Sequence, residues 1–190
     1  ADRIAHMMGV GLDYIIIPFR GEYMEINNLV LHSMVYPVPD LRYPFLGVHL
    51  TKTLDSKVLA GPTANLSFGR ESYEKKINIP ETFDMIGKPH FWRLIFDKEF
   101  IQTAIQYSRI TRSRKTFLKE IQTLAPEVDQ EDIFPSRSGI RAQMVDKKGK
   151  LLEDTLVTFL PDSTHVLNAV SPGMTCSLAF ATYVVRHMHS

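Results

Sequence analysis

Short runs of alternating apolar and polar positions, typical of β-strands, lie toward both ends of the chain. The expected strands are residues 14–26, 29–36, 45–53, 57–61, 138–145, 152–160 and 165–169. The first is bent at Pro18, and a hairpin turn at Asn27-Asn28 pairs it with the second. An extended loop over residues 37–44 follows, because each proline there disfavours helical backbone in the residue before it.

A helical period replaces the strand alternation between Pro80 and Leu124, where apolar side chains recur on one face of each helix. The expected helices are residues 2–9, 90–107, 114–124 and about 174–187. Strands, then helices, then strands in one chain predict an α+β domain with a mostly antiparallel or mixed sheet. The helices at about 80–125 form an insertion, and a strand followed by a helix ends the chain.

Composition narrows the functional class only modestly. The 190 residues are 44% hydrophobic and 23% charged, as in an ordinary globular protein with a real core. A net charge of +1 argues against a dedicated nucleic-acid binder. The single cysteine, Cys176, excludes an internal disulfide framework and fits a reducing compartment, so we expect a cytoplasmic protein.

The sequence also argues against a transmembrane segment and against a metal site. Residues 166–185 carry no charge and have about the length of a membrane span, but Ser171-Pro172-Gly173 interrupts them. We therefore expect a buried strand, a turn and a buried helix rather than a transmembrane segment. The seven histidines show no spacing typical of metal ligands, so we expect no metal.

The strand at 138–146 contains the most informative charged residue, Arg141, which lies among Ile and Met positions. A buried guanidinium without an anion is costly, and its forked donors match a carboxylate in a way that lysine cannot. Arg141 alone leaves two interpretations open. In the first, Arg141 faces solvent or pairs with a structural acid such as Asp154. In the second, it holds a substrate carboxylate in a dry pocket.

Two other places could carry chemistry. His49 lies on an expected strand between two apolar residues, and a histidine is well suited to accept a proton near neutral pH, although many strand histidines are structural. The turn at Ser171-Pro172-Gly173 leads into the last helix, whose first N–H groups suit an oxyanion, a phosphate or the electron-rich edge of a flavin ring. An ordinary strand–helix turn is the alternative. Tyr23 and Tyr36 could donate hydroxyl groups or simply pack.

Seven short motifs follow one another along nearly the whole chain. They occupy residues 18–23, 36–40, 44–51, 60–64, 68–73, 139–143 and 166–172. Together they resemble the L-2-hydroxyglutarate oxidase/dehydrogenase family, which belongs to the FAD-dependent oxidoreductases related to D-amino-acid and glycine oxidases. That family has an N-terminal βαβ unit with a Gly-x-Gly-x-x-Gly motif for the ADP half of FAD, and this sequence has no such motif. The chain therefore resembles the C-terminal portion of such an enzyme.

The resemblance implies a domain organisation and a reaction. Residues 1–12 would be a linking helix, residues 13–149 the substrate-binding domain, and residues 150–190 a return segment that completes the FAD domain. The implied reaction is oxidation of L-2-hydroxyglutarate to 2-oxoglutarate, with a hydride passing to the flavin. The alternatives are a related flavoenzyme that acts on an amine or glycerol phosphate, and a non-catalytic binding module that kept the fold.

The same resemblance assigns roles to individual residues. Arg141 would bind the substrate carboxylate, His49 would accept the hydroxyl proton, and Arg20 and Tyr23 would hold the distal carboxylate. The turn and helix start under the flavin pyrimidine edge would be Ser171, Pro172, Gly173, Met174 and Thr175.

The resemblance also predicts partners. A small dicarboxylate substrate and the missing FAD-binding half are expected, and this chain alone should bind FAD weakly or not at all. Apolar surface left exposed by a missing half would favour a homodimer. No nucleic acid is expected, and the full-length enzyme could lie at the periphery of a membrane.

Overall fold

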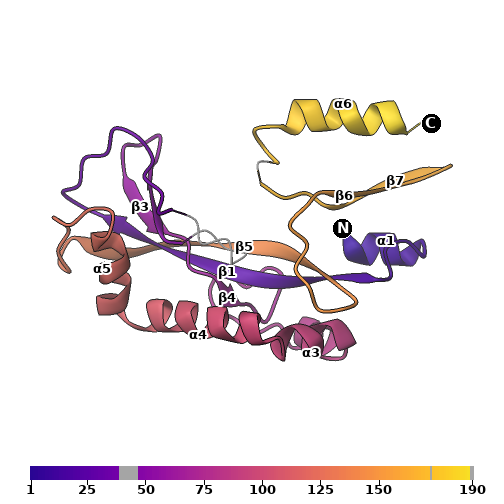
Figure 1. Cartoon of the computed structure of the whole chain (residues 1–190), viewed down its shortest axis with the longest axis horizontal. Coiled ribbons are helices and arrows are strands. Elements are labelled where there is room, and N and C mark those ends of the chain that lie inside the picture. Colours follow the sequence, from indigo (N-terminus) through magenta and orange to yellow (C-terminus); the bar gives the residue numbers. More distant parts are fainter. Residues whose placement is uncertain (39–46, 172, 189–190) are drawn as a thin grey trace.

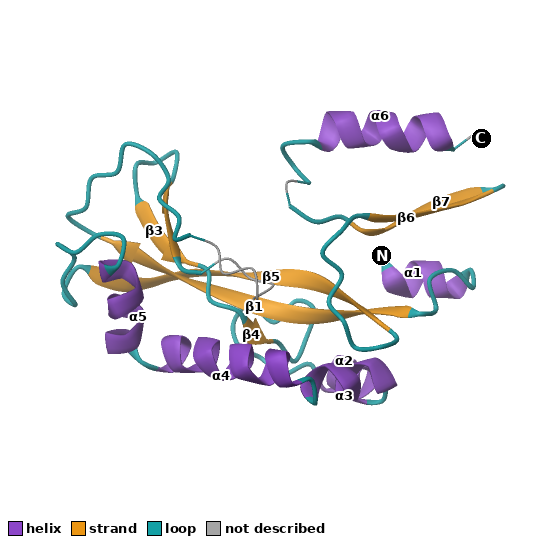
Figure 2. Cartoon of the chain, in the orientation of Figure 1, coloured by secondary structure: helices purple, strands orange, loops and turns teal. Residues whose placement is uncertain are grey.

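Two long antiparallel strands run through the molecule, and the other elements pack along them (Figure 1, Figure 2). They are β1 (Tyr14–Ile26) and β5 (Ile133–Asp146), and their register joins Tyr14 to Asp146 and Ile26 to Ile133, with an irregularity between Glu22 and Met24. The computed structural model describes residues 1–38, 47–171 and 173–188. The bounds of β1 are those predicted from its dense Ile, Tyr and Phe content.

Three shorter strands complete the main sheet. The sheet order is β2-β3-β1-β4, with β5 also paired to β1, and every pair is antiparallel. The bounds are His49–Lys52 for β2, Val58–Gly61 for β3 and Asn65–Leu66 for β4. A tight turn joins β2 to β3, because Ser56 adopts a left-handed φ of 64° and the two strands pair directly.

The predicted strand at 29–36 is wrong, since that segment forms only an isolated bridge between Val35 and Leu50. The end of β1 is instead tied to the residue before β5. The Asn27 amide donates to the Asp132 carbonyl, and the Asn28 side chain donates to the Asp132 carboxylate. Because β3 and β5 already pair with this end of β1, no ladder position remains for residues 29–36.

Four helices lie between β4 and β5 in the chain. They are α2 (Ile79–Ile86), α3 (Pro89–Ile95), α4 (Lys98–Arg112) and α5 (Arg114–Gln122). The single helix expected at 90–107 is therefore wrong. Asp97 divides it, because its carboxylate accepts a hydrogen bond from the Phe100 amide and so starts α4 as an N-cap. Ser113 caps α5 in the same way through the Thr116 amide.

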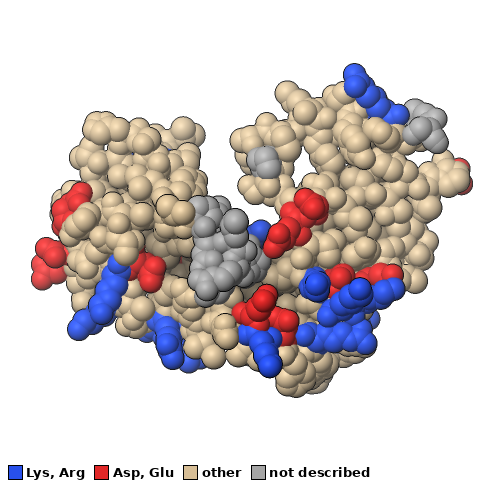
Figure 3. All heavy atoms as spheres, in the orientation of Figure 1, with Lys and Arg blue, Asp and Glu red and all other residues tan. Residues whose placement is uncertain are grey.

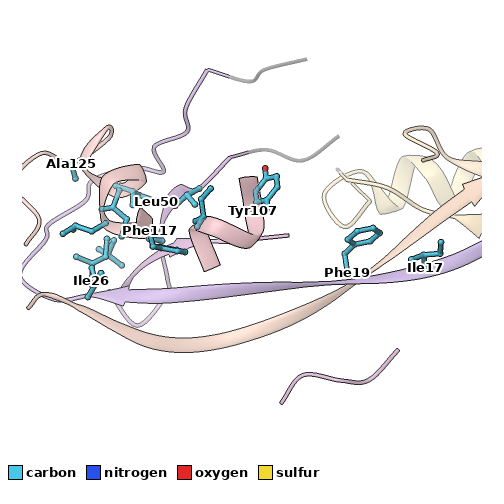
Figure 4. Close-up of a cluster of buried hydrophobic side chains, with 14 of the residues drawn as sticks. Ile17, Phe19, Ile26, Leu50, Tyr107, Phe117 and Ala125 are labelled. Carbon is cyan, nitrogen blue, oxygen red and sulfur yellow. The ribbon is translucent and has the colours of Figure 1, made fainter. Parts of the chain in front are cut away.

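The main hydrophobic core lies between the sheet and these helices. Figure 4 shows Ile17 and Phe19 of β1, Leu50 of β2, and Tyr107 and Phe117 of the helices within it, and all five are buried. Burial of one such side chain contributes roughly 1.5–3 kcal/mol. This core therefore fixes the position of the central strands on which the candidate site is built.

A smaller second core lies at the other end of β1 and β5, under the hairpin of β6 (Leu156–Leu160) and β7 (Ser163–Asn168). A tight turn over residues 146–149 brings the chain back beside β5, because the Asp146 amide donates to the Lys150 carbonyl and the Leu152 amide donates to the Met144 carbonyl. The strand expected at 152–160 nevertheless begins only at Leu156, and the return segment forms an isolated bridge between Val145 and Leu151. Further along, the Asn168 side-chain amide donates to the Asp154 carbonyl. This side chain therefore satisfies a backbone carbonyl in the segment before β6.

The last helix, α6 (Ser177–His187), lies beside the β6–β7 hairpin and away from α3–α5 (Figure 1). We expected it to be buried, and that expectation is wrong. None of its described residues is buried, and Leu178 is 86% exposed. Leu178 and Val185 stay exposed within the described part of the chain, whereas Tyr183 lies edge-on to Phe159 of β6. Within that part, no helix has both the length and the apolar character needed to cross a membrane.

A buried ion pair holds the first helix, α1 (Asp2–Met7), against the rest of the fold. The Arg70 guanidinium donates two hydrogen bonds to the two Asp2 carboxylate oxygens, at 2.6 and 2.8 Å, and the Ile16 amide donates another at 2.9 Å. Burial alone would raise the pKa of Asp2, but these hydrogen bonds outweigh it and lower the pKa to about 2.

We expect Asp2→Asn to lower the free energy of unfolding by about 2 kcal/mol, since each pKa unit corresponds to about 1.4 kcal/mol. The wild-type contribution is fully present above the ordinary pKa of 3.8 and is lost as the pH falls through 3.8 toward 2, because the unfolded chain takes up the proton first. Urea unfolding of the wild type and the variant at several pH values measures this contribution of Asp2 to stability. Asp84→Asn, at an exposed position, is the control, and equal stability of both variants would contradict the prediction.

Candidate functional site

Four of the expected site residues line one cavity of about 380 Å³. Tyr23 comes from β1, His49 from β2, Arg141 from β5, and Ser171 from the segment between β7 and α6. Figure 3 shows the surface hollowed between the part that holds β3 and the part that holds α6. Residues more than a hundred positions apart in sequence therefore meet at one place.

Strand alternation explains which residues of β1 reach this cavity. Phe19, Gly21 and Tyr23 of β1 line it, and the register places Arg141 opposite Phe19. Every second residue of a strand lies on the same face. Gly21 is required for close packing, because a Cβ there would lie 2.6 Å from the Pro62 Cβ. The glycine thus lets Pro62 form one wall of the cavity.

Arg141 does not lie in a dry pocket, and the expectation that it would be buried is wrong. Its side chain lines the cavity but remains exposed to solvent through the open side. The surrounding protein still lowers its pKa by partial burial, opposed by the Tyr107 hydroxyl group. An arginine stays protonated under any of these conditions, so a positive charge faces the cavity.

His49 is placed and polarised as a proton acceptor. Its Nδ1 lies 3.2 Å from the Gly47 carbonyl oxygen, and because a carbonyl only accepts, Nδ1 carries the proton and Nε2 keeps a lone pair. The ring also stacks on Tyr36, with 4.4 Å between centroids and an interplanar angle of 21°. Burial lowers the pKa of His49, while the bond to Gly47 opposes this. The neutral imidazole therefore predominates at neutral pH.

Tyr23 supplies a hydroxyl group that stays protonated. Burial raises the pKa of this phenol, and the Arg137 guanidinium, 5.9 Å from the ring centroid, opposes the shift. A protonated phenol can donate a hydrogen bond to a carboxylate. Tyr23 and Arg141 together therefore offer the cavity one neutral donor and one cation.

The chain beyond β7 only partly follows the expected pattern. The last helix begins at Ser177 rather than near Met174, and residues 173–176 form turns before it. Its N-cap residue, Cys176, makes no side-chain capping hydrogen bond. Thr175 is exposed and Met174 is 90% exposed, whereas Gly173 is partly buried. Pro172 lies outside the described residues.

The segment from Ser171 to the start of α6 offers both polar and apolar groups to a ligand. Ser171 lines the cavity, and the start of α6 lacks a side-chain cap that would compete for its amides. Exposed Met174 and Leu178 offer an apolar surface for a flat ring. Donors and apolar groups of the kind that contact a flavin are thus present in this segment.

Arg20 is the one predicted substrate residue that the structure does not bring to this cavity. It occupies an even position of β1, next to Phe19, and lines a neighbouring cavity together with Glu22. Its guanidinium forms an ion pair with the Glu22 carboxylate. The structure thus places Tyr23, but not Arg20, among the residues that line the candidate cavity.

Sequence reasoning missed two contributors to the site, Gly47 and Thr63. The Gly47 carbonyl sets the tautomer of His49, and Thr63 lines the cavity and accepts a hydrogen bond from the Glu22 amide through its hydroxyl oxygen. Both residues lie inside the motifs at 44–51 and 60–64, which was the available signal. Among the described residues, no group of three or more His, Cys, Asp or Glu is arranged to hold a metal ion.

Comparison with known proteins gives consistent similarities. The family model described as "FAD dependent oxidoreductase" matches residues 1–187. The chain is 33% identical over 194 residues to L-2-hydroxyglutarate dehydrogenase of Escherichia coli (strain K12), covering 100% of this chain and 46% of that protein. It is 36% identical over 184 residues to the protein of that name from Indibacter alkaliphilus, covering 94% of this chain and 46% of the relative.

A eukaryotic relative shows the same pattern. The mitochondrial L-2-hydroxyglutarate dehydrogenase of Mus musculus is 34% identical over 195 residues, covering 98% of this chain and 42% of that protein. The chain thus spans somewhat less than half the length of the curated relatives it matches.

Proposed function

This chain belongs to the family of FAD dependent oxidoreductases, and on that premise we propose that it is the substrate-binding half of an enzyme that oxidises L-2-hydroxyglutarate to 2-oxoglutarate. The observation that carries the proposal is the convergence of Tyr23, His49, Arg141 and Ser171 on one cavity. The names of the relatives point to the same substrate. A cavity of about 380 Å³ has the size of small-molecule sites in general.

The cavity's side chains fit the two ends of a 2-hydroxydicarboxylate. Arg141 binds one carboxylate through its forked donors, and the Tyr23 hydroxyl group donates to the other. His49 accepts the proton of the C2 hydroxyl group at Nε2, which the bond from Nδ1 to Gly47 leaves unprotonated. The flavin, when bound, supplies the acceptor for the hydride that leaves C2.

The proposed domain arrangement follows from the two cores. Residues 13–149 contain the main sheet and its helices and would form the substrate domain, with 80–125 as a helical insertion. Residues 1–12 would link it to the FAD domain, which residues 150–190 would complete. The separate core under β6 and β7 supports this division.

The exposed apolar side chains of α6 and β7 support a missing partner. Leu178, Val185 and Val166 are 86%, 59% and 36% exposed. We propose that an FAD-binding half covers them in the whole enzyme. In its absence, the same surface would favour association of two copies of this chain.

The 190-residue chain by itself should bind FAD weakly or not at all, since no residue here is proposed to hold the ADP half. The test is gel filtration of the chain after incubation with FAD, with the visible flavin absorption followed in the protein peak. A flavin-loaded peak of one FAD per chain would contradict the division into halves. Elution of the chain as a dimer would support the surface assigned to α6.

The reaction is tested on the full-length protein that carries this chain. Addition of L-2-hydroxyglutarate under anaerobic conditions should bleach the flavin and yield 2-oxoglutarate, whereas an amine or glycerol phosphate should not. Bleaching by an amine or glycerol phosphate alone would favour a related flavoenzyme. A bound flavin that none of these compounds reduces would favour a non-catalytic module.

A further inference from the structure

A second cavity, of about 470 Å³, lies beside the candidate site and is lined by more charged side chains. It is bounded by β4, by α4 and by the loop after β4, and it shares Phe19 and Ala64 with the candidate site as a common wall. Arg20, which the substrate site does not use, lies in it.

The charges that line this second cavity do not cancel. Arg20 and Lys75 both contact the same oxygen of Glu22, and Lys75 Nζ lies 3.0 Å from it. Arg112 also lines the cavity and forms no hydrogen bond or ion pair within the part of the chain that the structure describes. Three cations against one carboxylate leave an excess of two positive charges, without counting Lys76, which pairs with a neighbouring glutamate.

Burial of Arg20 increases the energetic cost of this excess positive charge. The Arg20 side chain is only 8% exposed, and burial lowers its pKa. A guanidinium has five N–H donors, and the described structure gives it one ion pair, to Glu22. Lys75 faces Glu22 from a left-handed backbone conformation, φ 64°, that is unfavourable for a residue with a side chain. The fold therefore gathers one buried and two exposed cations around a single carboxylate.

The rest of the lining is partly polar and partly apolar. Asn65 and Ser108 contribute an amide and a hydroxyl group, whereas Leu66, Ile95 and Phe100 contribute apolar surface. Small-molecule sites combine apolar walls with a few placed polar groups in this way. A ligand that matches both parts would carry one anionic group and a short apolar body.

We propose that this cavity is a second anion-binding site, which takes a small organic phosphate or carboxylate. Arg20, Lys75 and Arg112 bind the anionic group, and the apolar body packs against Phe100 and Leu66. The site is separate from the one that holds the proposed substrate and does not depend on that assignment. Because Phe19 borders both cavities, an occupant here contacts a wall of the substrate site.

Thermal unfolding of the full chain with phenyl phosphate and with inorganic phosphate tests the proposal, at an ionic strength held constant with sodium chloride. Both dianions should raise the melting temperature in a saturable way, and phenyl phosphate should bind more tightly through its ring. Arg112→Gln and Lys75→Gln, at exposed positions, should each weaken binding at least about tenfold. Arg109→Gln, exposed three residues earlier on α4, should leave it unchanged and is the matched control.

Arg141→Gln separates the two cavities, because it should leave the phosphate affinity unchanged. Loss of binding in that variant, with retention in Arg112→Gln and Lys75→Gln, would overturn the proposal and assign the anion to the substrate site. Stabilisation that does not saturate, or that all variants share, would overturn it as a general ionic effect. Arg20→Gln adds a direct test, provided that circular dichroism shows this variant to be folded.

Discussion

Arg141→Gln in the full-length protein should lower kcat/KM for L-2-hydroxyglutarate by about 100- to 1,000-fold. Removal of one partner of a hydrogen-bonded charge pair typically costs about 2–5 kcal/mol, and about 1.4 kcal/mol corresponds to a factor of ten. Arg141 lines the candidate cavity on the central pair of strands, so glutamine should fit without disturbing the core. Steady-state kinetics measures the effect, and KM should rise more than kcat falls, because the carboxylate is bound before and during the reaction.

The controls separate charge from geometry at this position. Arg141→Lys should recover only part of the loss, because an ammonium cannot make the paired hydrogen bonds of a guanidinium. Arg109→Gln removes an exposed arginine from α4 and should keep wild-type kinetics. Wild-type turnover in Arg141→Gln would remove this residue from the proposed substrate site.

His49→Asn should lower kcat by about 100- to 10,000-fold, the range that a general base typically contributes. The effect should also appear in the pH profile. Burial lowers the pKa of His49 below its ordinary 6.5, so wild-type kcat/KM should rise with pH through a limb below 6.5 and then stay level. The variant should lack that limb, because asparagine does not titrate.

Folding stability offers an independent check on the same group. Because His49 binds its proton less readily when folded than when unfolded, wild-type stability should fall as the pH drops below about 6.5. His49→Asn should reduce this dependence. His32→Asn, at an exposed position, should change neither the pH–rate profile nor the pH dependence of stability. A variant at position 49 that keeps the wild-type acid limb would exclude it as the base.

Local patterns predicted some elements well and others poorly, for identifiable reasons. The bounds of β1 follow from a dense run of strand-forming residues, and the family resemblance of the seven motifs is confirmed by the match over residues 1–187. The strand expected at 29–36 fails because its partner positions are occupied from elsewhere in the chain. The helix expected at 90–107 divides because Asp97 favours a new N-cap, a local signal that periodicity alone overlooks.

The sequence by itself determined the α+β class, the family, and Arg141 and His49 as the residues worth testing, because motifs and strand alternation are local properties. Only the tertiary structure decided which of these residues meet. The β1–β5 register places Arg141 opposite Phe19 and directs Arg20 into the neighbouring cavity. A shift of one residue would exchange the two faces of a strand, and the register depends on contacts between segments more than a hundred residues apart.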